Sequence, residues 1–172
     1  MCIRDRLDKV VLARVFTRGP IDTPAVLRAL AERFPTCATF AFGVGNREFS
    51  GASPERLVTR DGREVSTVAL AGTTGTGGDE TSDAELAAEM MASPKIRAEH
   101  QFVVDDITAR LATLGLVGET PVEPDVMRLA RVQHLRTPIT ARVERRSGGV
   151  SDMDVIRVAN VLHPSPAVGG TP

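Results

Sequence analysis

With 172 residues, 42% of them apolar and 25% charged, the chain has the size and composition of one ordinary globular domain or a portion of a larger one. A net charge of −1 and the lack of Trp and Tyr argue against a basic, aromatic surface for nucleic acid. No stretch approaches the roughly 18 apolar residues of a membrane helix, and residues 1–6 lack the apolar core of a secretory signal. A cytoplasmic protein without membrane or nucleic-acid partners is expected.

The N-terminal third predicts one helix among strands. Residues 10–16 are an apolar, β-branched run typical of a buried strand, and Lys9 stands at its start. A helix is predicted from Thr23, as N-cap before a proline at the first helical position, and it closes at Pro35. Further extended segments are predicted at 39–44, 47–52, 56–60 and 64–70, with a hairpin signal at 61–62.

The rest of the chain alternates helices with extended segments. A glycine-threonine loop is predicted at 71–78, and Ser82 with Glu85 forms a capping box that opens a helix to about residue 91. The later predictions are a helix at 94–114, an extended segment at 128–143 interrupted at Pro138, and a helix at 153–162. Strands mixed with helices indicate an α/β or α+β sandwich, and the hairpin excludes a purely parallel sheet.

Glu99 is the most informative polar residue, because it falls between Ile96 and Val103 on the apolar stripe of its predicted helix. A carboxylate facing a core is costly unless it is paired, neutralised or bound to a cation. Two interpretations stay open: an ion pair with an arginine or a rotated helix that brings Glu99 to water, and a metal or catalytic role. His100 is expected to point elsewhere on the helix and is interpreted as structural.

Two residues, Lys9 and Glu55, each allow either a structural or a catalytic interpretation. Lys9 is one of only two lysines in the chain. Lys9 is either a strand-end side chain that reaches water or a buried amine whose lowered pKa lets it accept a proton. Glu55 is either an ordinary surface residue or a carboxylate projected from the rigid bend at Pro54. The Gly72-Thr73 loop offers backbone N–H groups to a carboxylate or phosphate, yet it is neither a Walker loop nor a dinucleotide fingerprint. His134 lacks the spacing of a metal ligand.

Six motifs stand in a characteristic order, at residues 7–14, 51–55, 69–73, 93–100, 133–135 and 163–167. In this order they resemble the motifs of isochorismate synthases, which belong to the chorismate-utilising enzymes. The resemblance implies an α+β fold of mixed, largely antiparallel sheets flanked by helices, here incomplete, and usually a monomer. It also implies that residues 7–172 are a partial chorismate-binding catalytic domain truncated at both ends, and that residues 1–6 are a non-native leader.

The resemblance assigns roles to residues by their positions in the motifs. Lys9 is implied as the general base that activates water for attack at C2 of chorismate, and Glu55 as the general acid for the departing C4 hydroxyl. Glu99 is implied as a ligand of the cofactor Mg²⁺, which prefers oxygen donors and often takes only one or two protein carboxylates. The implied substrate-binding residues are Gly72, Thr73, His134 and Ala167.

Some features depart from the family or leave its members undistinguished. Residues 74–78 lack the arginine that usually follows the Gly-Thr pair, and the family's domain continues past Pro172 with a second metal-binding glutamate. The chain alone is therefore expected to be inactive. Salicylate synthases share the lysine at the position of Lys9 and are the nearest alternative; a non-catalytic binding module that keeps the fold is an alternative of another class. The motifs fit a menaquinone or a siderophore pathway equally.

Overall fold

The structure is a computed structural model that describes residues 19–143 and 155–164. Lys9, Ala167 and the strand predicted at 10–16 lie outside the described residues. The chain divides into two compact units at Arg56 and Leu57. We call residues 19–56 the small unit and residues 57–143 with 155–164 the main unit, and describe each by itself.

The small unit is a helix and a β-hairpin. Helix α1 (Thr23–Arg33) precedes strands β1 (Ala38–Val44) and β2 (Arg47–Ser53), which pair antiparallel around a turn at Gly45. The predicted helix is confirmed, but its N-cap is Asp22 rather than Thr23: the Asp22 carboxylate accepts a 3.0 Å hydrogen bond from the N–H of Ala25. The rings of Phe40 and Phe49 meet across the strands with centroids 5.5 Å apart.

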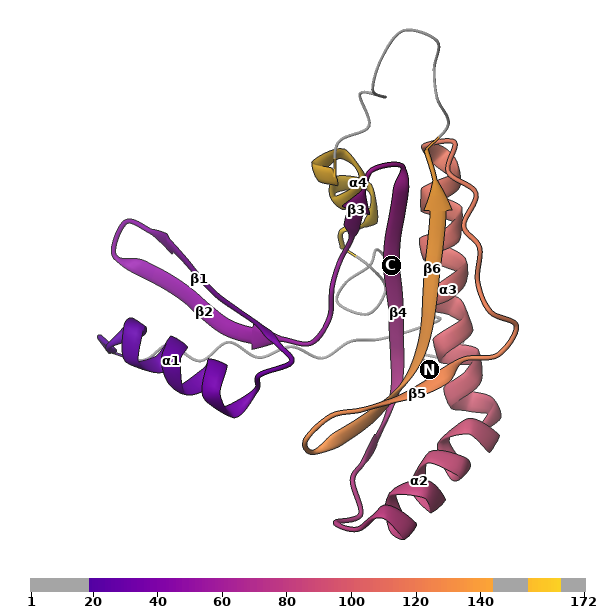
Figure 1. Ribbon diagram of the computed structural model, residues 1–172, viewed down its shortest axis with the longest axis horizontal. Helices are drawn as coiled ribbons and strands as arrows, with labels where there is room; N and C mark the ends of the chain where they lie inside the picture. Colours follow the sequence, from indigo (N-terminus) through magenta and orange to yellow (C-terminus); the bar gives the residue numbers. More distant parts are fainter. Residues whose placement is uncertain (1–18, 144–154, 165–172) are drawn as a thin grey trace, which may run out of the picture. The chain divides into compact units, whose positions relative to one another are not determined.

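The main unit is built on one antiparallel sheet of four strands in the order β3-β4-β6-β5. These strands are β3 (Thr59–Asp61), β4 (Glu64–Gly75), β5 (Asp125–Arg128) and β6 (Val132–Arg142), and the helices are α2 (Glu80–Ala92), α3 (Pro94–Thr113) and α4 (Val155–Leu162). The long helix α3 runs alongside β4 and β6 (Figure 1). Antiparallel strands flanked by helices confirm the α+β class.

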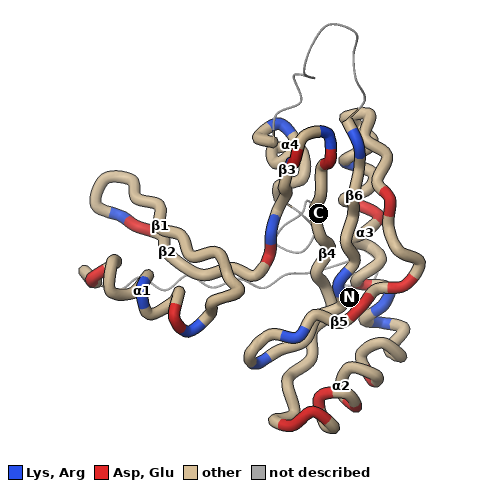
Figure 2. Tube along the Cα trace, in the orientation of Figure 1, with Lys and Arg blue, Asp and Glu red and all other residues tan. Residues whose placement is uncertain are grey.

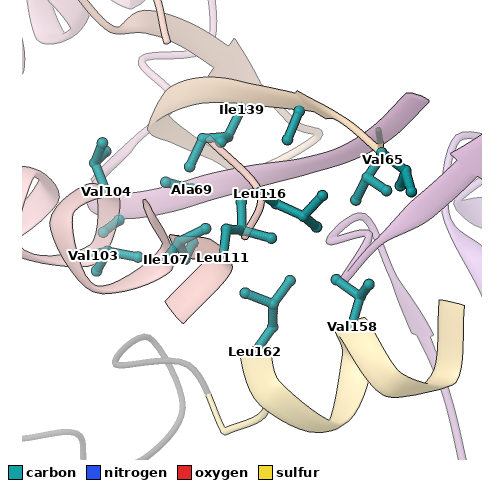
Figure 3. Close-up of a cluster of buried hydrophobic side chains, with 13 residues drawn as sticks. Val65, Ala69, Val103, Val104, Ile107, Leu111, Leu116, Ile139, Val158 and Leu162 are labelled. Carbon is teal, nitrogen blue, oxygen red and sulfur yellow. The ribbon is translucent and has the colours of Figure 1, made fainter. Parts of the chain in front are cut away.

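The core lies between the sheet and its helices. Alternate residues of the strands and one stripe of α3 are buried together, with α4 closing one end (Figure 3). The members labelled in the figure are Val65, Ala69, Val103, Val104, Ile107, Leu111, Leu116, Ile139, Val158 and Leu162. Burying a side chain such as Leu111 stabilises the fold by about 1.5–3 kcal/mol relative to leaving it in water.

Glycine ends α3 and returns the chain to this core. Gly115 takes a φ of 73°, Leu116 donates from its N–H to the carbonyl of Leu111 at 3.1 Å, and Gly115 donates to Ala112 at 2.9 Å. This is a Schellman arrangement, in which only glycine adopts the left-handed conformation without strain. As a result the side chains of Leu111 and Leu116 are both buried.

The structure corrects two predicted boundaries between residues 71 and 91. Strand β4 continues to Gly75 where a loop was predicted from residue 71, because β6 extends far enough to pair with it, as far as Val132. Helix α2 begins at Glu80 with Asp79 as its N-cap, so the capping box at Ser82 is wrong by one turn; the Asp79 carboxylate accepts from the N–H of Ser82 at 2.8 Å. Figure 2 shows acidic residues gathered at this end of α2, where the helix dipole favours negative charge.

Pro138 does not interrupt β6, contrary to the prediction. Thr140 exchanges backbone hydrogen bonds of 2.7 and 3.0 Å with Glu119 on the side of β6 away from β4. Backbone groups two residues apart in a strand point to the same side, so the nitrogen of Pro138 also faces away from β4. The pairing of β5 stops opposite Arg136. The proline therefore occupies an edge position where its missing N–H breaks no ladder bond.

Across the described residues, no helix is both long and apolar enough to cross a membrane.

The cap of α2 can be tested against the residue that the sequence favoured. The pKa of the Asp79 carboxyl lies below its ordinary value, chiefly because the N–H of Ser82 donates to the carboxylate. A depressed folded-state pKa means that the cap stabilises above the ordinary pKa and that this stability is lost as the pH falls through the folded value. We expect Asp79→Ala to lower the thermal midpoint at pH 7 more than the matched Ser82→Ala, and the gap to close in acid. Equal midpoints at pH 7 would contradict the assignment of the cap.

Candidate functional site

The face of the main sheet opposite α3 carries two of the residues that the motifs predicted for substrate binding. The strand register puts Thr73 of β4 directly opposite His134 of β6, and Met127 of β5 on the far side of His134. Directly opposed residues lie on the same face of a sheet. Thr73 and His134 are in contact: Thr73 Oγ1 lies 2.9 Å from His134 Nδ1.

A β-bulge at Gly72 brings Thr73 to this face. Ala71 pairs with Leu135 and Thr73 pairs with His134, so Gly72 is an extra residue on β4. Side chains alternate along a strand, so in a regular strand Thr73, two residues after Ala71, would share the buried face of Ala71. The bulge at Gly72 therefore shifts by one residue the alternation of β4 side chains between the face towards α3 and the face away from it.

Gly72 suits this position for two separate reasons. Its φ is 76°, a conformation that a side chain disfavours. A Cβ at this position would also collide with the side chain of Ile96, in the first turn of α3, and would lie 3.5 Å from Leu135. Gly72 thus lets α3 approach the bulge closely, which brings the Gly-Thr motif and the Glu-His motif of α3 together.

His100 is buried behind the bulge, and the expectation that it points away from the apolar stripe is wrong. Its side chain is only 2% exposed. Its Nδ1 lies 3.2 Å from the carbonyl oxygen of Ala71, and its Nε2 lies 2.7 Å from the hydroxyl of Thr137. The sequence did hold a signal for this, because positions 100, 103, 104, 107 and 111 repeat at helical spacing and are the buried residues of α3.

Glu99 lies at the margin of the buried stripe and is half-buried. Its carboxylate is an oxygen donor of the kind Mg²⁺ prefers, and a partly dry position strengthens attraction to a cation. Within the part of the chain that the structure describes, no group of three His, Cys, Asp or Glu side chains is placed to hold a metal. Glu99 thus offers one oxygen donor of a kind that fits Mg²⁺, and its role as a Mg²⁺ ligand stays a prediction.

Glu55 lies in the small unit, two residues after the end of β2. The Ser53 hydroxyl accepts a 3.2 Å hydrogen bond from the N–H of Glu55 and donates at 3.3 Å to its carbonyl oxygen. These bonds across Pro54 fix the bend that the sequence predicted. The roles predicted for Glu55 and for Lys9, like that of Ala167, stay predictions.

The glycine-rich segment after β4 is held by its neighbours rather than left with free donors. The N–H of Gly77 donates to the Asp83 carboxylate at 2.7 Å, and the N–H of Thr76 donates to the carbonyl of Arg131 at 3.3 Å. The buried amide of Gln133 donates to the carbonyls of Asp83 (3.0 Å) and Gly75 (3.4 Å). Asp83 also forms an ion pair with Arg128. The backbone N–H groups at positions 76 and 77 therefore have partners within the main unit.

An ion pair that the sequence reasoning missed lies beside His134. Arg136 and Asp125 make two hydrogen bonds, of 2.7 and 2.5 Å, across β6 and β5. The Arg136 side chain lowers the pKa of the Asp125 carboxyl, mainly by hydrogen bonding, and the pKa of Arg136 rises in return. Both side chains are about half exposed, so the pair is worth at most about 1 kcal/mol of stability. Its effect on the site is to offset the charge of Arg136.

A hollow of about 260 Å³ lies along the first half of α3, lined by Arg97, Ala98, His100, Gln101 and Pro124. Among the described site residues, neither Thr73 nor His134 lines it. The two residues in contact, Thr73 and His134, thus lie outside this hollow, on the face opposite α3.

Comparison with known proteins gives the class to which this fold and these motifs belong. The chorismate binding enzyme family matches residues 2–172. The salicylate biosynthesis isochorismate synthase of Pseudomonas aeruginosa is 45% identical over 169 residues, which cover 97% of this chain and 34% of that protein. The isochorismate synthase MenF of Bacillus subtilis is 37% identical over 168 residues, 96% of this chain and 34% of that protein.

Solved structures show the same fold. The menaquinone-specific isochorismate synthase MenF of Escherichia coli matches 90% of this chain and 35% of its own, with a TM-score of 0.72 and 31% identity. DhbC of Bacillus anthracis matches 90% of this chain and 41% of its own, with a TM-score of 0.78 and 33% identity.

This chain belongs to the chorismate binding enzyme family, and its homologues include isochorismate synthases. It spans about a third of the length of the two curated relatives described above.

The requirement for glycine at the bulge can be measured. We expect Gly72→Ala to lower the free energy of unfolding by about 2–4 kcal/mol, because it adds an unfavourable positive φ to a steric clash with Ile96. Gly75→Ala is the matched control on the same strand, since an added Cβ there meets nothing within 4 Å. Urea unfolding of the three proteins gives the values. In an Ile96→Ala background the cost of Gly72→Ala should fall; an unchanged cost would show that the clash is not its source.

Proposed function

We propose that this chain is part of an isochorismate synthase, which converts chorismate to isochorismate by adding water at C2 and releasing the C4 hydroxyl. The observation that carries the proposal is the contact of Thr73 with His134 at a glycine bulge, within a chain whose homologues are isochorismate synthases at 30–45% identity. Relatives two to three times longer support a longer working protein.

In this proposal Lys9 and Glu55 carry out the proton transfers. The neutral amine of Lys9 takes a proton from water as the new C2–O bond forms, and the Glu55 carboxylic acid gives a proton to the C4 oxygen as that bond breaks. The ring double bonds shift between the two carbons. One water is consumed and one released, so the reaction is an isomerisation. Well-placed general acids and bases contribute about 10²–10⁴-fold each.

In this proposal an anionic substrate binds next to Mg²⁺. The Thr73 hydroxyl and His134 ring share one face of the sheet, where they can hydrogen-bond to a carboxylate, and Ala167 is proposed to complete the substrate contacts. Glu99 is proposed as one Mg²⁺ ligand, and Mg²⁺ when bound would offset the carboxylate charge of chorismate. The Arg136–Asp125 pair leaves little net charge beside His134.

The chain has a matched control for the proposed base, because Lys9 and Lys95 are its two lysines. The assay uses the extended protein, which is this chain together with the coding sequence on both sides that brings it to its relatives' length. We expect Lys9→Ala to lower the conversion of chorismate by at least about 100-fold, and Lys95→Ala to leave it near the unmodified rate. Full turnover by Lys9→Ala would refute the proposed base.

Product analysis in the same assay separates the neighbouring activities. Isochorismate as the end product supports the proposal, and fluorescent salicylate would assign the chain to a salicylate synthase instead. A protein that binds chorismate without converting it would be a binding module. Chorismate should also raise the thermal midpoint only when Mg²⁺ is present, and Glu99→Ala should remove that dependence.

A further inference from the structure

His100 makes two hydrogen bonds that together assign the proton positions of its neutral ring. A carbonyl oxygen can only accept, so Nδ1, which faces the Ala71 carbonyl at 3.2 Å, must carry a proton. In the neutral ring Nε2 is then an acceptor, and the Thr137 hydroxyl donates to it at 2.7 Å. The tautomer is assigned here from the partners of the ring.

These two hydrogen bonds connect His100 to both β4 and β6 beside the β-bulge at Gly72. Ala71 is the last residue of β4 before the bulge, and Thr137 lies on β6 two residues beyond Leu135, the partner of Ala71. One side chain of α3 thereby ties both strands together on the buried face. The bulge residue itself, Gly72, has no side chain with which to fix its own conformation.

The polar contacts are costly for a core that could be apolar. His100 and Thr137 are only 2% and 4% exposed, among aliphatic residues of α3 and the sheet. A buried imidazole or hydroxyl loses its water and is tolerated only when it is hydrogen-bonded. A leucine would fill a similar volume without this requirement. The polar pair of His100 and Thr137 is thus best explained by the hydrogen bond of His100 to the carbonyl of Ala71, immediately before Gly72.

We propose that His100 is a positioning residue: by holding Ala71 and Thr137, it keeps the bulge at Gly72 in the form that turns Thr73 to the opposite face, against His134. The inference rests on the proposed function in one respect, since Thr73 and His134 are the residues proposed to bind chorismate. The arrangement of the bulge itself can be tested without a substrate.

Nitrogen NMR of the histidine rings provides that test, because the chain has three histidines, His100, His134 and His163. In the 172-residue chain we expect His100 to carry its proton on Nδ1. Thr73→Val removes the hydroxyl beside His134 and gives the reference shift of the His134 Nδ1 signal. We expect His100→Leu to produce the same His134 shift. Val104→Ala, a buried change one turn further along α3, should not.

An unchanged His134 signal in folded His100→Leu would overturn the proposal. If that variant does not fold, Thr137→Val decides instead: it removes one of the two bonds in a similar shape and should move the His134 signal part of the way. No movement there would overturn the proposal equally. His100→Asn returns an N–H donor near the place of Nδ1 and should recover part of the signal relative to His100→Leu; equal shifts would overturn the assigned bond to Ala71.

Chorismate binding by the extended protein then separates this proposal from the proposed function. With Mg²⁺ present, we expect His100→Leu to weaken chorismate binding about tenfold relative to Val104→Ala, the size of one lost hydrogen bond. If the unmodified protein binds no chorismate, the proposed function fails, and the ring signals still decide the role of His100. If His100→Leu binds as tightly as Val104→Ala, the positioning role fails and the proposed function stands.

Discussion

The β-bulge at Gly72 is the constraint on which the rest of the main unit depends. An extra residue on β4 changes which side chains face α3 and which face away, and this change falls between Ala71 and Thr73. Before the bulge, alternate residues of β4 enter the core; after it, Thr73 turns to the other face. A glycine is needed because φ is positive and because Ile96 occupies the space of a side chain. Gly72 thus allows α3 to pack closely on one face of the sheet and also places the Thr73 side chain on the other face.

This constraint explains why separate motifs belong together. The Gly-Thr motif ends the regular part of β4, the Glu-His motif lies in the second turn of α3, and the Gln-His-Leu motif begins β6. Each lies where its element contacts the bulge: Ile96 against Gly72, His100 against Ala71, and His134 against Thr73. The glycine-rich segment that follows is held in turn by Asp83 and Gln133. These three motifs therefore meet at the bulge, although they lie far apart in the sequence.

The sequence predicted the helices and the central hairpin well, because proline, capping side chains and helical periodicity are local signals. It failed where pairing with a distant strand decides the structure. The glycines and threonines after residue 70 are typical of a loop, yet β6 lies beside them and extends β4 to Gly75. Pro138 is typical of an interruption, yet its nitrogen faces an edge. The predicted direction of His100 is wrong because Ile96 and Val103 suggest a stripe centred on Glu99, whereas the buried stripe of α3 runs through His100, one residue away. A bulge adds a residue without leaving a recognisable sequence pattern, so the contact of Thr73 with His134 was not predicted; the family motifs implied only that both residues bind substrate.

The adjacent residues Glu99 and His100 of α3 differ in burial and in proposed role. Successive residues of an α-helix point about 100° apart, so a fully buried His100 leaves Glu99 at the margin of the stripe, half-buried. His100 reaches inward to the bulge, while Glu99 is partly exposed and is proposed to bind Mg²⁺. Since both side chains come from the same turn of α3, any rotation of the helix that moved Glu99 would also disturb the bonds of His100 to Ala71 and Thr137. In the proposed enzyme, the helix that supplies a metal ligand is thereby fixed in orientation by the same contacts that set the direction of Thr73.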